Sequence, residues 1–162
     1  MDKTVLESYR KFVSQIEIRD LCLVQATVEN LSWPEKPAGP WRVHVERKMT
    51  YENGEGSFTC MDHYTLISKV EHARKRAAKL SVRFAVVYSS KMPMDDKLFD
   101  PFRNTNLVVN TWPYLREFAQ NTFARMNVPL GIAPTMKVGT DPRPRVETPA
   151  EDAPCAAEVV GA

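Results

Sequence analysis

Four runs of alternating apolar and polar residues fill the first half of the chain and limit the folds open to it. The most regular is Leu80 to Tyr88, where every second residue is apolar. Such alternation is typical of strands that bury one face of a sheet. The other runs are Gln15 to Glu29, Trp41 to Arg47 and Ser57 to Glu71. The segment Glu52-Asn53-Gly54-Glu55-Gly56 lies between the second and third runs. It is a hairpin turn signal, because Asn-Gly tolerates the positive φ that such turns need.

The first run departs from strict alternation at one point. A single register would place these residues on one buried face: Ile16, Ile18, Cys22, Val24, Ala26 and Val28. Asp20 interrupts that face, and Leu21 and Leu23 fall on the other. We therefore expect a β-bulge near Arg19-Asp20, or a strand that is covered on both faces.

An amphipathic helix is expected after the strands. Behind Pro113, mainly apolar residues recur at intervals of three and four: Leu115, Phe118, Ala119, Thr122, Phe123 and Met126. This stripe predicts a helix that packs on a core, with Pro113 in its first turn, where a missing N–H costs nothing. Asn127 would cap its end and Pro129 would prevent its continuation. Shorter helices are expected at residues 3–14 and 96–104. The predicted class is α+β, a four-stranded antiparallel sheet packed with helices.

Length, charge and cysteine content indicate the class of protein and its compartment. The 162 residues, with a net charge of +2, predict one folded unit and give no sign of nucleic-acid binding. No apolar run is long enough for a membrane span, and the N-terminus lacks the order of a signal peptide. Three cysteines far apart in the sequence fit a reducing compartment. We therefore expect a cytoplasmic protein without a membrane partner.

The last part of the chain differs from the rest in composition. Residues 139–162 contain four prolines, five acidic residues and no aromatic residue. Such a segment cannot bury enough apolar surface to offset its ordering entropy. We therefore expect a folded domain at residues 1–138 and a disordered tail at residues 139–162 that is dispensable for folding.

The polar residues offer little catalytic or metal-binding chemistry. Cys60 and His63 stand three apart in a predicted strand, and this spacing directs their side chains to opposite faces. His44 and His72 do not complete a four-ligand zinc site. We therefore expect no metal. Glycine fingerprints for phosphate binding are also absent, so we expect no cofactor. A small enzyme of the thioesterase-like type, on a similar α+β sheet, is the alternative to a non-enzyme.

Three short motifs follow one another near the C-terminus. They are Pro113-Tyr114-Leu115-Arg116-Glu117, then Val128-Pro129, whose proline lies sixteen residues after Pro113, and then Ile132-Ala133-Pro134. The segment from Asn106 to Pro134 resembles the C-terminal part of SecB, the tetrameric export chaperone. That family carries a Pro-Tyr-Ala-Arg-Glu helix start, a Phe-Pro and a Leu-Ala-Pro. Its order of four antiparallel strands followed by helices agrees over residues 14 to 134.

The resemblance implies an ATP-independent chaperone, or holdase, that binds unfolded or nascent polypeptides as a homotetramer, a dimer of dimers. In SecB an acidic stretch of the first strand docks the SecA motor. Asp20 matches the beginning of that stretch, but its later glutamate has no counterpart here. The family's final helix is also missing. Because some SecB-like proteins protect antitoxins in toxin–antitoxin systems, the implied partners are unfolded clients, an antitoxin or SecA.

Aromatic residues are the client-binding candidates that the resemblance suggests. They are Trp33, Trp41, Phe99, Phe102, Trp112 and Tyr114. The first two bracket a proline-rich loop beside which SecB-like proteins take up extended chains, and the others cluster before and at the main helix. A core position is the alternative for most of them, because large aromatic side chains are usually buried. Trp33 is the best single candidate, because a tryptophan in such a loop is hard to bury.

Overall fold

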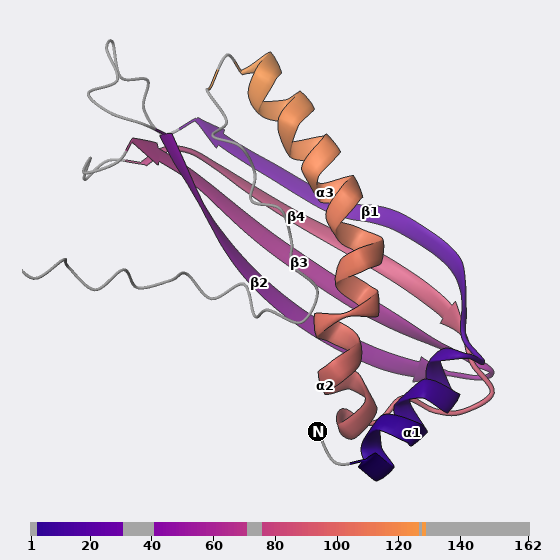
Figure 1. The fold of residues 1–162 in the computed structure, drawn as a ribbon. Helices are drawn as coiled ribbons and strands as arrows, with labels where there is room; N and C mark the ends of the chain where they lie inside the picture. The colour runs from indigo at the N-terminus through magenta and orange to yellow at the C-terminus, as the bar shows by residue number, and fades with distance from the viewer. Residues whose placement is uncertain (1–2, 31–40, 71–75, 127, 129–162) are drawn as a thin grey trace, which may run out of the picture.

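The computed structural model describes residues 3–30, 41–70, 76–126 and 128. In this part of the chain a four-stranded antiparallel sheet packs against helices (Figure 1). The elements are α1 (Lys3–Val13), β1 (Glu17–Asn30), β2 (Trp41–Gly54), β3 (Ser57–Val70), β4 (Arg76–Ser89), α2 (Asp96–Asn104) and α3 (Asn106–Arg125). The strands lie in the order β1-β4-β3-β2. The predicted α+β class and the order of elements are confirmed.

The hairpin between β2 and β3 turns within the predicted segment Glu52 to Gly56, at its last two residues rather than at Asn53-Gly54. Gly54 pairs with Ser57, so the loop consists of Glu55 and Gly56, and the positive φ of 61° belongs to Gly56. Asn53 instead forms two hydrogen bonds outside the turn. Its side chain donates to the carbonyl of Met94 at 2.9 Å and accepts from the N–H of Met94 at 2.8 Å. It thereby fastens the end of β2 to the connection that leads into α2.

Two irregularities shape β1. The register with β4 shifts between Ile18 and Asp20, as predicted, and shifts again between Leu23 and Gln25. Each shift leaves one residue of β1 without a cross-strand partner, which is the pattern of a β-bulge. The prediction that Cys22 shares a face with Ile18 is therefore wrong, because a bulge exchanges the faces of the residues beyond it. Val24 is the unpaired residue at the second shift.

The main helix starts earlier than its sequence predicted. α3 begins at Asn106, so Pro113 lies inside it rather than in its first turn. A proline within a helix removes the hydrogen bond to the carbonyl four residues earlier. That carbonyl belongs to Val109, whose side chain is 52% exposed, so water has access to this side of the helix. The predicted stripe is confirmed at Leu115, Ala119 and Phe123, which are all buried.

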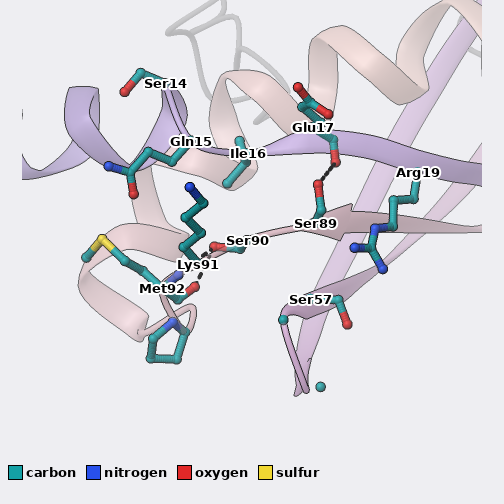
Figure 2. Close-up of a pocket in the computed structure, with 13 residues that line it drawn as sticks. Ser14, Gln15, Ile16, Glu17, Arg19, Ser57, Ser89, Ser90, Lys91 and Met92 are labelled. Carbon is teal, nitrogen blue, oxygen red and sulfur yellow. Dashed lines mark hydrogen bonds between the residues drawn. The ribbon is translucent and has the colours of Figure 1, made fainter.

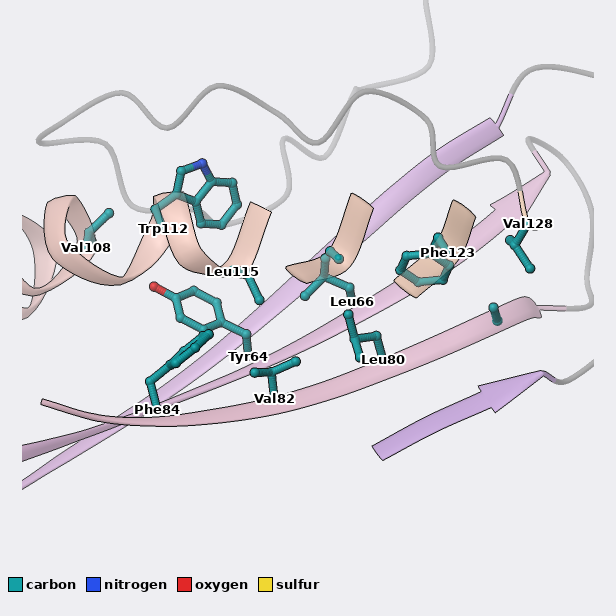
Figure 3. Packing of buried hydrophobic residues seen from close by; sticks show 12 residues of the cluster. Tyr64, Leu66, Leu80, Val82, Phe84, Val108, Trp112, Leu115, Phe123 and Val128 are labelled. Atoms are coloured by element: carbon teal, nitrogen blue, oxygen red, sulfur yellow. The ribbon is translucent and has the colours of Figure 1, made fainter. Parts of the chain in front are cut away.

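The core is formed between α3 and the sheet, and continues toward α1 and α2. Figure 3 shows Leu115 and Phe123 of α3 next to Leu66, Leu80 and Val82 of the sheet. A second cluster contains Phe12 of α1, and further members are Phe58, Cys60, Val86, Tyr88, Met94, Leu98, Phe99, Phe102 and Leu107. Helices therefore cover one face of β3 and β4. We call the opposite face of the sheet the outer face.

A buried ion pair connects the sheet with the helices. Arg47 of β2 donates through Nε and Nη2 to both carboxylate oxygens of Asp62 on β3, at 2.7 and 2.6 Å. Its Nη1 donates to the carbonyl of Arg103 at the end of α2, at 2.8 Å. Thr111 of α3 donates to Asp62 at 2.7 Å, and its hydroxyl also lies 2.8 Å from the hydroxyl of Tyr64. This network fixes the positions of α2 and α3 over the sheet.

Several predictions concern residues outside the described part of the chain. They are the loop with Trp33, the basic segment with His72, the cap at Asn127, and the tail at residues 139–162 with its boundary at 138. None of the described helices is long and apolar enough to cross a membrane.

Candidate functional site

An exposed apolar strip runs along β1 on the helix-covered side of the sheet. It consists of the residues that the two bulges bring to one face: Ile18, Leu21, Leu23, Ala26 and Val28. They pair in register with Tyr88, Val86, Phe84, Val82 and Leu80 of β4, which are buried in the core. Cross-strand partners share a face. We call this surface the β1 strip.

The β1 strip remains accessible because the helices do not extend over it. Ile18 is 48% exposed, Leu23 43% and Val28 40%. The corresponding stretch of β4, from Leu80 to Tyr88, is about 26 Å long at ~3.3 Å per residue. Leu21 is partly buried against both core clusters, and the exposed residues lie on either side of it. Single exposed apolar residues are normal, but a row of this length is typical of an interaction surface.

β1 is also an edge of the sheet. Among the described strands it pairs only with β4, so the backbone groups on its other side have no strand partner there. An unpaired edge is a template for another extended chain, which gains main-chain hydrogen bonds along it. The strip and the edge together provide apolar contacts and backbone pairing in one place.

α3 borders the β1 strip and runs beside it in Figure 1. Between them, at the start of α3, lies a cavity of about 200 Å³, lined by Val13, Ile16, Ile18, Tyr88, Asn106 and Asn110. Asn110 donates to the hydroxyl of Tyr88 at 2.9 Å, which fixes this side of α3 toward β1. Tyr114 follows Asn110 by one helical turn, so it lies on the same side of α3, where it is 54% exposed.

The structure separates the aromatic client-binding candidates. Phe102 is completely buried, and Phe99 and Trp112 are 7% and 8% exposed, so these three are core residues in this conformation. Only Tyr114 among the candidates with a described side chain is exposed. Trp41 begins β2, but its side chain is outside the described part, as is all of Trp33. Among the candidates with a described side chain, Tyr114 alone is exposed on the side of α3 that carries Asn110.

Trp112 has one unusual property. Its indole N–H is buried and has no hydrogen-bond partner among the described residues, although its ring packs at 6.0 Å from the ring of Tyr64. A buried donor without an acceptor costs free energy. The ring is nevertheless held by the core cluster that contains Val108 and Leu115. Apolar packing therefore holds the Trp112 ring in place.

Asp20, the predicted motor-docking residue, is exposed on the outer face. It pairs in register with Val87 of β4, which belongs to that face. Its location is thus separate from the β1 strip, on the other side of the sheet. On the same face of β1, Glu17 precedes Asp20, and Cys22 and Gln25 follow it, so the family's later glutamate has no counterpart after Asp20.

Cys60 and His63 cannot act together. Cys60 is buried in the core on the helix-covered side, and burial, with a contribution from Asp62, raises the pKa of its thiol to about 12. His63 lies on the outer face, with its Nε2 2.7 Å from the Oγ of Ser81. The predicted separation of the two side chains is therefore confirmed. Among the described residues no group of three or more metal-binding side chains is close enough to hold an ion.

A larger cavity at the end of the sheet is polar but contains no catalytic pair. It has a volume of about 770 Å³ and lies where the start of β1, the β2–β3 hairpin and the segment after β4 meet (Figure 2). Arg19 and Lys91 line it together with several serines. The hydroxyls of Ser89 and Ser90 donate to the carbonyls of Glu17 and Met92. Neither hydroxyl therefore donates to the carboxylate of Glu17 or to the amine of Lys91, the two side chains of the lining that could serve as a general base.

Comparison with known proteins links this architecture to one group. A chain from Mycobacterium tuberculosis, the Rv1957 SecB-like chaperone in complex with a ChAD peptide from the Rv1956 HigA1 antitoxin, superimposes with a TM-score of 0.68. The fold is that of a SecB-like chaperone. The match covers 77% of this chain and 93% of the other, at 15% sequence identity. No protein-family model and no curated protein matched the sequence.

The SecB-like fold confirms the resemblance read from the C-terminal motifs, but the β1 strip was not predicted as a site. The sequence pattern marked these residues as a buried strand face, because alternation shows that residues share a face and not whether that face is covered. In the sequence, Asp20 indicates the first bulge, because it interrupts the apolar alternation of the strand. The second bulge, which brings Ala26 and Val28 into line with Leu23, has no such signal.

Proposed function

We propose that this protein is an ATP-independent SecB-like chaperone that holds unfolded or nascent polypeptides on the β1 strip. The observation that carries the proposal is the exposed apolar row of Ile18, Leu23 and Val28 on an unpaired edge strand. An unfolded chain offers apolar side chains and free backbone groups, and this surface accepts both. Binding would shift clients away from aggregation by mass action alone.

Antitoxins are the first client class to test. The structural neighbour was solved with a peptide from an antitoxin, so a chaperone of this fold takes up such segments. Protein export is the other role that the sequence resemblance implies, with SecA docking at Asp20. We favour the antitoxin role, because only one carboxylate of the family's docking stretch is present in β1. Binding of SecA to the wild-type chain but not to Asp20→Asn would favour export instead.

The decisive experiment measures the affinity for an unfolded client. A Leu23→Ser/Val28→Ser variant removes apolar surface from the strip, and Val109→Ser removes it from an exposed position of α3 as the matched control. Fluorescence anisotropy with a labelled antitoxin-derived peptide, and light scattering of an aggregating unfolded protein, report on binding and protection. We expect the strip variant to lose affinity at least tenfold while Val109→Ser retains it.

Two results would contradict this assignment. If the strip variant binds clients normally but changes the mass of the assembly, the strip is an interface between copies of the chain. If the wild-type chain does not protect clients but hydrolyses acyl thioesters, the enzyme alternative is correct.

A further inference from the structure

Three basic residues form a row across the outer face of the sheet. Lys48 of β2 is directly opposite His63 of β3, which is directly opposite Arg83 of β4. Neighbouring strands are ~4.8 Å apart, so the row spans about 10 Å. Side chains that stand opposite each other in antiparallel strands point to the same face, and like charges in such positions destabilise a sheet. We call these three residues the basic row.

The described part of the chain provides no acidic partner for the basic row. Lys48 and Arg83 form no ion pair with a described residue, and His63 contacts the hydroxyl of Ser81. Glu46, two residues before Lys48, pairs with His44 at 3.5 Å. The other nearby acids are bound elsewhere or point away: Glu29 pairs with Lys79, and Asp62 pairs with Arg47 on the opposite face.

The positive charge of the row also affects the pKa of its central residue, His63. Desolvation lowers the pKa of His63, and the charges of Arg83 and Lys48 lower it further, while Asp62 acts in the opposite direction. An anionic group placed over the row would offset the two cations and raise this pKa. The histidine is therefore a built-in reporter of whatever covers the surface.

We propose that the basic row is the docking surface for the chain's own acidic C-terminal segment, residues 147–162. That segment contains four acidic residues and no basic one. Its charge thus complements that of the row, and as part of the same chain it is present at a high effective concentration. The proposal is independent of the function proposed for the β1 strip.

The connecting chain is long enough for this contact. The last described residue, Val128, belongs to the core cluster under α3. Residues 129–146 then precede the acidic segment, and eighteen extended residues span up to about 60 Å. A strand of 14 residues, as in this sheet, is about 46 Å long. The acidic segment can therefore reach around an edge of the sheet to the row.

The surroundings of the row favour a short acidic peptide over a nucleic acid. Five acidic residues occupy other positions of the outer face: Glu17, Asp20, Glu29, Glu46 and Glu52. A continuous phosphate backbone would pass over some of these carboxylates, whereas a few carboxylates fit within the 10 Å of the row. Because the contact is at the surface, we expect it to add little to stability. Its effect is to screen the row from acidic segments of other proteins.

The test measures the pKa of His63 by NMR in the full chain and in a chain truncated after Val146. We expect the pKa to be lower by about 0.5 unit in the truncated chain, and the difference to vanish at high ionic strength. The full-length variant Glu147→Gln/Glu151→Gln/Asp152→Asn/Glu158→Gln should behave like the truncated chain. Both chains should melt at nearly the same temperature.

A second measurement adds a synthetic peptide of residues 147–162 to the truncated chain. The amide signals of Met61 and Ala85, which flank the row on the outer face, should shift. The shifts should disappear in Lys48→Gln/Arg83→Gln and persist in Lys91→Gln, an exposed cation outside the row.

Three outcomes would overturn the proposal. Equal His63 pKa values in both chains, without peptide-induced shifts, would show that the segment does not dock. Shifts with a single-stranded oligonucleotide but not with the peptide would make the row a nucleic-acid contact. Shifts that depend on protein concentration, equally in both chains, would place a second copy of the chain on this face.

Discussion

At the scale of single residues, the stability of this fold depends on charges placed inside it. The side chains of Arg47 and Asp62 are 2% and 0% exposed, and each is fully occupied by the other and by neighbouring groups. Such a pair contributes less by its attraction than by the cost of breaking it, because the remaining charge is then buried alone. The network also defines one arrangement of α2 and α3 on the sheet.

Replacing Asp62 by asparagine should therefore be severely destabilising. We expect Asp62→Asn to lower the free energy of unfolding by about 3–5 kcal/mol, because Arg47 keeps its charge without a counter-charge. Asp100→Asn is the matched control, since Asp100 pairs with Arg103 at the surface, where a pair contributes about 0–1 kcal/mol. Urea unfolding followed by circular dichroism measures both. Similar losses in the two variants would show that the buried pair has no special role.

His63 gives the fold a dependence on pH. Its pKa in the folded chain lies below the ordinary value of 6.5, because of desolvation and the charges of Arg83 and Lys48. The unfolded chain therefore binds more protons as the pH falls through 6.5, and the folded state loses stability there. His63→Gln removes this contribution. We expect the loss of melting temperature between pH 7.5 and pH 5.5 to be smaller in His63→Gln, and a larger loss would reverse the sign of our argument.

At the scale of elements, α3 separates a structural face from an accessible one. Leu115, Ala119 and Phe123 face the sheet, while Tyr114 faces solvent beside the β1 strip. The same helix thus holds the core together and borders the proposed client site. Aromatic residues that are neighbours in sequence consequently have different roles.

Alanine substitutions should resolve these roles. Tyr114→Ala should weaken client binding at least several-fold with little change in stability, since an exposed aromatic anchor at an interface often contributes about 2 kcal/mol. Phe102→Ala should instead lower the free energy of unfolding by about 3–5 kcal/mol, because it leaves a cavity in the core. Client titrations and chemical unfolding measure the two effects. Unchanged client affinity in Tyr114→Ala would remove this residue from the site.

The sequence predicted elements better than it predicted their ends and their exposure. The alternation of apolar and polar residues predicted β4, and the stripe of Leu115, Ala119 and Phe123 predicted α3. Both patterns follow directly from backbone geometry. The start of α3 was missed, since packing of Leu107 and Trp112 extends the helix through Pro113 against local preference. The site was missed for a similar reason: whether β1 is covered depends on how far the helices reach over the sheet.

At the scale of the whole molecule, the remaining question is how an exposed apolar strip is tolerated in solution. Large exposed apolar surfaces favour association. The resemblance to SecB implies a homotetramer, and equivalent two-fold contacts are the common way to build one. An assembly would shield part of this exposed apolar surface.

Static light scattering should therefore give four times the chain mass of 18.5 kDa at micromolar concentration. Truncation after Val138 should leave this value unchanged, since the tail is not expected to contribute to the core. The mass of a single chain under these conditions would contradict the tetramer.

Hydrogen exchange can locate the capture of extended polypeptides at β1. Amide exchange should be compared in the free protein and in the protein saturated with an antitoxin-derived peptide. We predict added protection of β1, Glu17–Asn30, because a bound chain pairs with its free edge. β2, Trp41–Gly54, is the other edge of the described sheet and serves as the internal control. Protection at β2 or elsewhere, with β1 unchanged, would contradict the account.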